Sequence, residues 1–217
     1  MSQKQPDSYH SLIADLSLDS SEESASDLTV LTHLANVVAG VTADIARQLE
    51  VIYPFFVYRE ASYHAYHRIV IYAHPSSDEQ DVPFVGFVSR RRTQLDPEIV
   101  QQVSDIDRIL VMELAAHGNL LNYSSMQLHD GNWFNLVQFA RPDGQEAVPA
   151  TKTHQHAAYE LAPRYYRWIR LHHGLIPRGD PANGLQLHST KYYTFHASTP
   201  RPDIRVHHYQ QDLVMQP

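Results

Sequence analysis

Histidine and tyrosine are the chemically versatile residues of this chain, which has 217 residues with fifteen His and thirteen Tyr. Two histidine pairs have spacings that metal ligands use. His64 and His67 would share a face only on a helix, and the sequence around them is typical of a strand end. His154 and His156 would share a face on an extended segment, so we keep them as candidate metal ligands. Exposed loop histidines are the simpler interpretation, because no HExxH pattern is present.

The stretch RYYRWIRLHH, residues 164–173, has the highest density of chemically useful side chains. Read as a helix, it places Arg164 and Arg167 one turn apart. Two guanidinium groups so placed can hold a carboxylate or phosphate while an aromatic ring stacks on the ligand. The alternative is an amphipathic helix whose arginines are solvated.

An acid/base residue or a haem axial ligand would have to be a histidine that projects from a rigid element. His172, near the end of the predicted helix, and His188, on the predicted last strand, are the candidates. His117 and His173 each precede a glycine, which favours a helix C-terminus where a cationic side chain is mildly stabilising.

A hairpin is predicted over residues 121–140, with the turn His129-Asp130-Gly131-Asn132. Tyr123 lies on its first strand, and Trp133 and Asn135 share a face of the second. With Tyr192 they could line an apolar cavity that has a few polar groups, as ligand sites do. The alternative is a packed core in which the tyrosine hydroxyls find partners.

The composition excludes several classes of site. The chain has no cysteine, so a thiolate metal site and a disulfide are ruled out. A net charge of −7 argues against nucleic-acid binding. There is no GxSxG motif and no phosphate-binding glycine loop. Without an apolar run of about 18 residues or a signal-peptide pattern, we expect a cytoplasmic protein with no membrane contact.

Four regions follow from the patterning along the chain. Residues 1–26 form an acidic, mobile tail, residues 27–81 a helix and a β-hairpin extension, residues 82–196 an α+β domain, and residues 197–217 a C-terminal arm. Within the domain the predicted elements are a strand at 82–91, a helix at 95–118, the hairpin, a helix at 156–174 and a strand at 185–196. The expected fold class is therefore α+β.

This order is a ferredoxin-like β-α-β-β-α-β unit, and it resembles the dimeric α+β barrel superfamily. The resemblance covers about residues 82–196 and rests on topology, with no signature motif. It implies a ligand cavity between sheet and helices, and a homodimer. The uncovered sheet face would be covered by a second sheet from residues 51–74 or by a second subunit.

The resemblance also implies a function. It points to a small-molecule-binding, oxidative enzyme, either haem-dependent or a cofactor-free oxygenase, that acts on an aromatic or acidic ligand. Two alternatives stay open. One is a non-catalytic interaction or assembly protein that uses the terminal extensions, and the other is a His-ligated metal enzyme.

Overall fold

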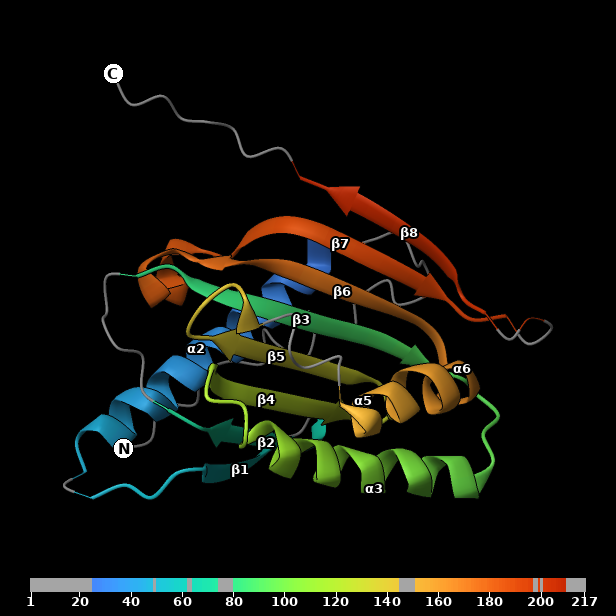
Figure 1. Ribbon diagram of the computed structural model, residues 1–217, viewed down its shortest axis with the longest axis horizontal. Coiled ribbons are helices and arrows are strands. Elements are labelled where there is room, and N and C mark those ends of the chain that lie inside the picture. Colours follow the sequence, from blue (N-terminus) through green and yellow to red (C-terminus); the bar gives the residue numbers. More distant parts are fainter. Residues whose placement is uncertain are drawn as a thin grey trace.

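The structure, a computed structural model, describes residues 25–48, 50–61, 64–73, 80–144, 151–196, 199 and 201–209. Almost all of the predicted acidic tail, and its predicted mobility, lies outside these residues. The described part is a mixed α and β structure around one antiparallel sheet of eight strands, in the order β1-β2-β4-β5-β3-β6-β7-β8. Helices lie on both sides of this sheet (Figure 1).

The strands are β1 (Phe55–Ala61), β2 (His64–Ile71), β3 (Val82–Arg91), β4 (Leu120–Leu128), β5 (Trp133–Phe139), β6 (Tyr166–Ile176), β7 (Gln186–Thr194) and β8 (Asp203–His208). The helical segments are α2 (Ala25–Ala46), α3 (Pro97–Leu114), α5 (Lys152–His156), the π-helix η2 (Ala157–Leu161), α6 (Ala162–Tyr165) and the short 3₁₀ turns η3 (Pro177–Gly179) and η4 (Pro181–Asn183).

The two faces of the sheet carry different helices. We call the side covered by α2 the α2 face, and the side that carries α3, α5, η2 and α6 the α3 face (Figure 1). Because side chains alternate along a strand, every strand contributes to both. On the α2 face, Leu31 and Leu34 of α2 pack in one buried cluster with Phe84, Val88 and other strand residues.

Helix α2 begins close to the predicted position and continues through Gly40, where a break was thought possible. Its apolar residues Val30, Leu31, Leu34, Val38 and Ile45 are buried. Residues 27–46 are long and apolar enough, by length and composition alone, to cross a membrane. The expectation that no such segment exists was therefore wrong, although packing against the sheet also accounts for the apolar residues.

Helix α3 was predicted correctly, with Pro97 as its first residue. The Asp96 side chain caps it by accepting a hydrogen bond from the Glu98 amide at 2.9 Å. Buried residues Ile99, Val103, Val111 and Leu114 face the sheet. The hairpin was also predicted correctly, because β4 and β5 flank residues 129–132 and pair with each other.

The second predicted helix, residues 156–174, is correct in its first part and wrong from residue 166 onward. The helical segments end at Tyr165, and residues 166–176 form β6, which pairs with β3 and β7. Trp168, Arg170 and His172 are buried on the α2 face of this strand. As a central strand, β6 is buried on its α2 face and at least half-buried at Leu171 and His173 on its α3 face, so its sequence lacks the polar alternation that marks a half-exposed strand.

The expected extensions join the main sheet. The β1–β2 hairpin pairs with β4 and so continues the sheet instead of forming a second sheet over it. The face that the second sheet was expected to cover is covered by α2 instead. In the predicted C-terminal arm, β8 pairs with β7 and is the last strand at that edge.

Candidate functional site

The middle of the α3 face is partly accessible to solvent, although it lies on the central strands. Val85 and Phe87 on β3, Asn135 and Val137 on β5 and Leu171 on β6 are all partly exposed. Their neighbours on the α2 face, among them Phe84, Val88, Phe134, Leu136 and Arg170, are buried. The helices of the α3 face therefore leave these side chains only partly covered, and we call the five residues the apolar floor.

A cluster of aromatic and charged side chains adjoins this floor. We call it the Tyr123 site, and its members are Tyr66, Arg68, Asp107, Tyr123, Trp133 and Asn135. Arg68 Nη2 donates to Asp107 Oδ1 at 2.9 Å, and its guanidinium carbon lies 5.6 Å from the ring centres of both Tyr66 and Tyr123. The Tyr123 hydroxyl donates to the same Asp107 oxygen at 3.4 Å. Asp107 thus reaches from α3 to two strands.

The remaining two members are placed by strand pairing. Tyr66 and Trp133 make an edge-to-face contact with ring centres 6.2 Å apart. Asn135 lies opposite Ser125 on β4 and Phe87 on β3, and Ser125 in turn lies opposite Arg68 on β2. The polar groups therefore run across adjacent strands of one sheet face.

Several polar atoms of the Tyr123 site are buried without a partner. Among the described residues, Trp133 Nε1, Asn135 Oδ1 and Arg68 Nε find no hydrogen bond. A buried polar atom left unpaired costs about 1–3 kcal/mol, so most such atoms in proteins bind another group or a water. Each of these three atoms can therefore bind a water or a polar group of a ligand.

Burial raises the pKa of the phenols around this site above their ordinary value, which already leaves them neutral at pH 7. Burial raises the pKa of Tyr66 to about 12, and it raises the pKa of Tyr123 still further, with the Asp107 carboxylate adding to the effect. Burial also keeps the pKa of Tyr166 well above its ordinary value. These hydroxyls are therefore neutral hydrogen-bond donors at pH 7.

His173 lies on the same face, opposite Val85 of the floor. Burial, with smaller effects of the Lys191 and His172 charges, lowers the pKa of His173 to about 4. Its imidazole is consequently neutral at pH 7 and is a weak base. Burial also lowers the pKa of His154 on α5.

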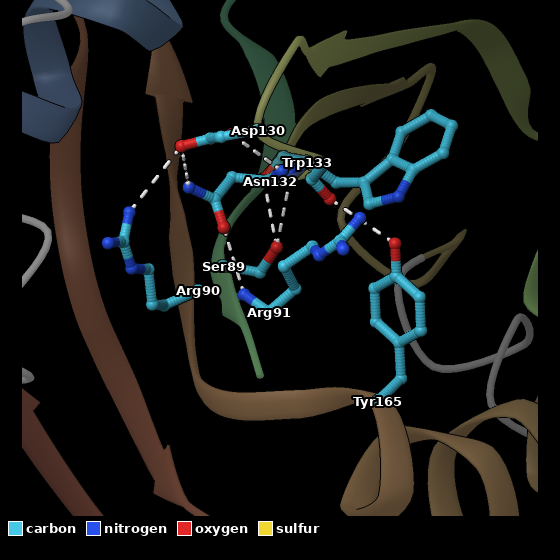
Figure 2. Close-up of polar contacts among 8 residues, drawn as sticks. Ser89, Arg90, Arg91, Asp130, Asn132, Trp133 and Tyr165 are labelled. Carbon is cyan, nitrogen blue, oxygen red and sulfur yellow. Dashed lines mark hydrogen bonds and ion pairs between the residues drawn. The ribbon is translucent and has the colours of Figure 1, made fainter. Parts of the chain in front are cut away.

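The turn between β4 and β5 holds Trp133 in position (Figure 2). Ser89 Oγ accepts a hydrogen bond from the Trp133 amide and donates one to the Trp133 carbonyl, both at 3.2 Å. Asn132 Oδ1 accepts from the Arg91 amide at 2.9 Å, and Tyr165 donates to the Gly131 carbonyl at 3.3 Å. The turn is thereby fixed to the ends of β3 and α6.

A separate buried polar network lies on the α2 face. Asp27 of α2 forms an ion pair with Arg170, at 2.7 Å to Nη2 and 2.6 Å to Nε, and accepts from His172 Nε2 at 2.8 Å. His172 Nδ1 contacts Thr190 Oγ1 at 2.9 Å, and Thr190 contacts the Tyr209 hydroxyl at 3.1 Å. The first four residues are buried, so we interpret this network as the anchor of α2. Sequence reasoning took Asp27 for a helix cap, because nothing local reveals a partner 143 residues away.

The structure divides the predicted site residues between these two faces. It places Tyr123, Trp133 and Asn135 on the α3 face; alternation predicted the shared face of Trp133 and Asn135, and strand pairing adds Tyr123. Tyr192 lies on the α2 face, buried, with the Arg205 guanidinium 5.4 Å from its ring centre. His172 lies on the α2 face as well, so these two residues are separated from the Tyr123 site by the sheet.

The remaining candidates lie apart from one another. Arg164 is on α6 and Arg167 on β6, both exposed, so the helical spacing that would make them a pair does not exist. His188 lies at a β-bulge of β7, and its Nε2 is buried without a partner among the described residues.

His154 and His156 are on helix α5 and not on an extended segment. Residues two apart on a helix point in different directions, and His156 pairs with Glu160 at 3.0 Å. The prediction that the two histidines share a face of an extended segment, and could therefore bind a metal together, was wrong. The part of the chain that the structure describes contains no cluster of three or more potential metal ligands.

Comparisons with known proteins give little guidance. No protein-family model matches the sequence, and no curated protein matches it. One similar solved structure is that of a "putative monooxygenase from Lactobacillus acidophilus NCFM", with 11% identity and a TM-score of 0.35. The match covers 55% of this chain and 57% of that one, so the chain spans little more than half the length of its neighbour. A similarity this low establishes neither fold nor activity.

Proposed function

We propose that this protein binds a small aromatic molecule at the Tyr123 site and acts on it as an oxygenase-like enzyme built around a ferredoxin-like unit. Partial exposure of the apolar floor beside unpaired, buried polar atoms carries this proposal.

The arrangement of the central strands supports the ferredoxin-like part of the proposal. The four strands lie in the order β4-β5-β3-β6, and the helices that link β3 to β4 and β5 to β6 both lie on the α3 face. In a ferredoxin-like unit the first and third strands are the central pair, and here these are β3 and β5. β1, β2, β7, β8 and α2 are then additions to that unit.

The side chains favour an aromatic ligand with a polar group. Phe87, Val85 and Val137 offer an apolar surface for a ring. The Trp133 indole N–H can donate to a ligand oxygen, and Asn135 Oδ1 can accept from a ligand hydroxyl. Asp107, held by Arg68, is the carboxylate placed to accept a proton at this site. An electron-rich ring that has lost a proton can supply its own electrons to O₂, which would make a bound cofactor unnecessary.

A haem-dependent reaction finds less support. Both ring nitrogens of His172 already have partners, Asp27 and Thr190, so His172 does not fit as an axial ligand. His188 keeps an unpartnered Nε2 in the described part of the chain and is the residue that a hemin titration would test. A Soret band that appears when hemin is added to the wild-type protein, and that is lost in His188→Ala, would support haem binding through His188. A hemin spectrum that the wild-type protein does not change would exclude haem binding.

The test of the binding proposal is calorimetric titration of 2-naphthol into the wild-type protein and two variants. Trp133→Phe keeps a six-membered aromatic ring and removes the pyrrole ring with its N–H, so we expect about two- to tenfold weaker binding. Trp168→Phe is the matched control, because Trp168 is on the α2 face, and its affinity should equal that of wild type. Equal affinities in all three proteins would contradict the proposed site.

The reaction class is tested separately by oxygen uptake in the presence of electron-rich naphthols and phenols. Uptake that needs the protein and falls in Asp107→Asn would support an oxygenase. Binding without any uptake would leave a ligand carrier and contradict the oxidative reaction.

A further inference from the structure

The edge strand β8 is the most exposed strand of the described sheet. Each of its six residues, Asp203–His208, is exposed. It pairs with β7 on one side, and no strand of the described chain follows it on the other. Figure 1 shows β8 at the margin of the molecule, away from the helices that cover the sheet. An edge of this kind is a template for pairing with another strand.

The side chains of β8 make this edge unusual for a monomer. Ile204 is 57% exposed and Val206 is 48% exposed. Both lie on the α3 face, since they are opposite Tyr193 and Lys191 of β7. Soluble proteins usually protect an edge with lysine, proline or a bulge, whereas here two β-branched apolar residues occupy one side of it.

We propose that β8 pairs in antiparallel fashion with β8 of a second copy, around a two-fold axis at Arg205. This register sets Ile204 of each copy opposite Val206 of the other, which gives two apolar cross-strand pairs on the α3 face. On the α2 face it sets Asp203 of each copy opposite His207 of the other. Both sets of pairs are self-complementary, as a two-fold interface requires.

The unfavourable contact of this register is between the two Arg205 side chains, and their orientation keeps the two charges apart. Arg205 would face its own copy across the axis, but its guanidinium lies 5.4 Å from the Tyr192 ring and so points back toward β7. Asp203 binds His196 through Oδ2 at 2.9 Å. Its side chain is 79% exposed, so the carboxylate can also meet a His207.

The competing arrangement joins β8 of one copy to β1 of the next. The β1 edge also presents exposed aromatic residues, Phe56 and Tyr58. That contact is head-to-tail and does not close, so it would produce oligomers that grow with concentration. The two-fold pairing instead stops at a dimer.

Light scattering after size exclusion tests the proposal through the mass, with 24.8 kDa expected for a monomer. We expect twice that mass at high protein concentration, and at least a tenfold loss of dimer affinity in Val206→Lys. Ile52→Lys is the matched control, since Ile52 is 87% exposed and lies outside the strands. It should leave the dimer unchanged.

Crosslinking tests the register. The chain has no cysteine, so a single introduced cysteine can form a disulfide only with another copy. Arg205→Cys should crosslink rapidly, because opposed residues of an antiparallel pair lie within disulfide reach. Arg201→Cys, four residues from the axis, should not. A monomer at every concentration, larger oligomers, or a dimer in which Val206→Lys has no effect and Arg205→Cys does not crosslink would each overturn the proposal.

Discussion

His172 and His173 are neighbours in sequence but lie in opposite environments, because successive side chains of a strand point to opposite faces. His172 is buried on the α2 face between Asp27 and Thr190. His173 is on the α3 face, where burial lowers its pKa to about 4. The first histidine therefore contributes to anchoring α2, and the second presents a neutral ring near the apolar floor.

The lowered pKa of His173 predicts a dependence of stability on pH. Between pH 6.5 and about 4, the unfolded chain binds a proton at this residue and the folded protein does not. The contribution of His173 to the stability of the folded protein is thus fully present above pH 6.5 and is lost as the pH falls toward 4. Urea unfolding at pH 7, 6, 5 and 4 measures the free energy of unfolding. This free energy should fall less steeply with decreasing pH in His173→Gln than in wild type. The exposed-residue control His208→Gln should follow the wild-type curve, and identical curves for all three proteins would contradict the environment assigned to His173.

Part of the Tyr123 site could be predicted at the residue scale. Alternation along the hairpin correctly placed Trp133 and Asn135 on one face, and pairing of the hairpin strands added Tyr123. Tyr192 was misplaced, because which face of a distant strand meets the hairpin depends on the register of β6 and β7. Arg68 and Asp107 were missed for the same reason: they come from β2 and α3, 39 residues apart.

At the scale of elements, α2 takes the place that a second sheet was expected to fill. It covers the α2 face with apolar residues and inserts Asp27 beside Arg170 and His172. A buried ion pair adds little net stability, but removing one partner leaves a buried charge uncompensated. The network therefore fixes where the helix lies.

Asp27→Asn is expected to destabilise the protein by about 3–5 kcal/mol, because it leaves the Arg170 charge buried without its carboxylate. Equilibrium urea unfolding measures this loss. Asp44→Asn on the same helix removes an exposed carboxylate whose pair with Arg47 is also exposed, and it should change stability by less than about 0.5 kcal/mol. The combination of Asp27→Asn with Arg170→Met should recover part of the loss. Equal effects of the two aspartate variants would contradict the anchoring role.

Two glycines should respond to alanine with opposite signs. Gly131, in the turn between β4 and β5, has a φ of +84°, and an added Cβ would meet the Arg91 side chain. Gly131→Ala should therefore cost at least about 1–2 kcal/mol. Gly40 is inside α2 with no atom within 4 Å of the position of a Cβ, so Gly40→Ala should stabilise by about 0.5–1 kcal/mol. Thermal unfolding of both variants checks the pair, and a destabilising Gly40→Ala would argue against a continuous α2.

Most of the elements could be predicted from the sequence, and the exception has a physical reason. The first helix, α3 and the hairpin carry strong local signals, namely apolar periodicity, a Pro at the helix start and an Asp-Gly turn. Residues 166–173 have helix-compatible residues at helical spacing, yet they form a strand because β3 and β7 pair with them on both sides. Pairing between distant strands overrides local propensity.

For the whole molecule, the eight-stranded sheet separates two kinds of interior. The α2 face is packed and closed, while the middle of the α3 face stays partly open beside the Tyr123 site. The sequence indicated α+β architecture, and the family resemblance implied a ligand cavity between sheet and helices, which stays a prediction. The sequence could not indicate that the N-terminal helix closes the other face, because a single apolar stripe fits many partners.

The two tryptophans of the chain allow a direct test of the proposed ligand site. Trp133 belongs to the Tyr123 site, and Trp168 lies on the opposite face. In a ¹⁵N-correlated NMR spectrum each gives one indole N–H signal, and Trp168→Phe assigns them. On titration with 2-naphthol, the account predicts that the Trp133 signal moves as its N–H gains an acceptor while the Trp168 signal stays fixed. Movement of the Trp168 signal alone, or of neither signal at millimolar 2-naphthol, would contradict a ligand site on the α3 face.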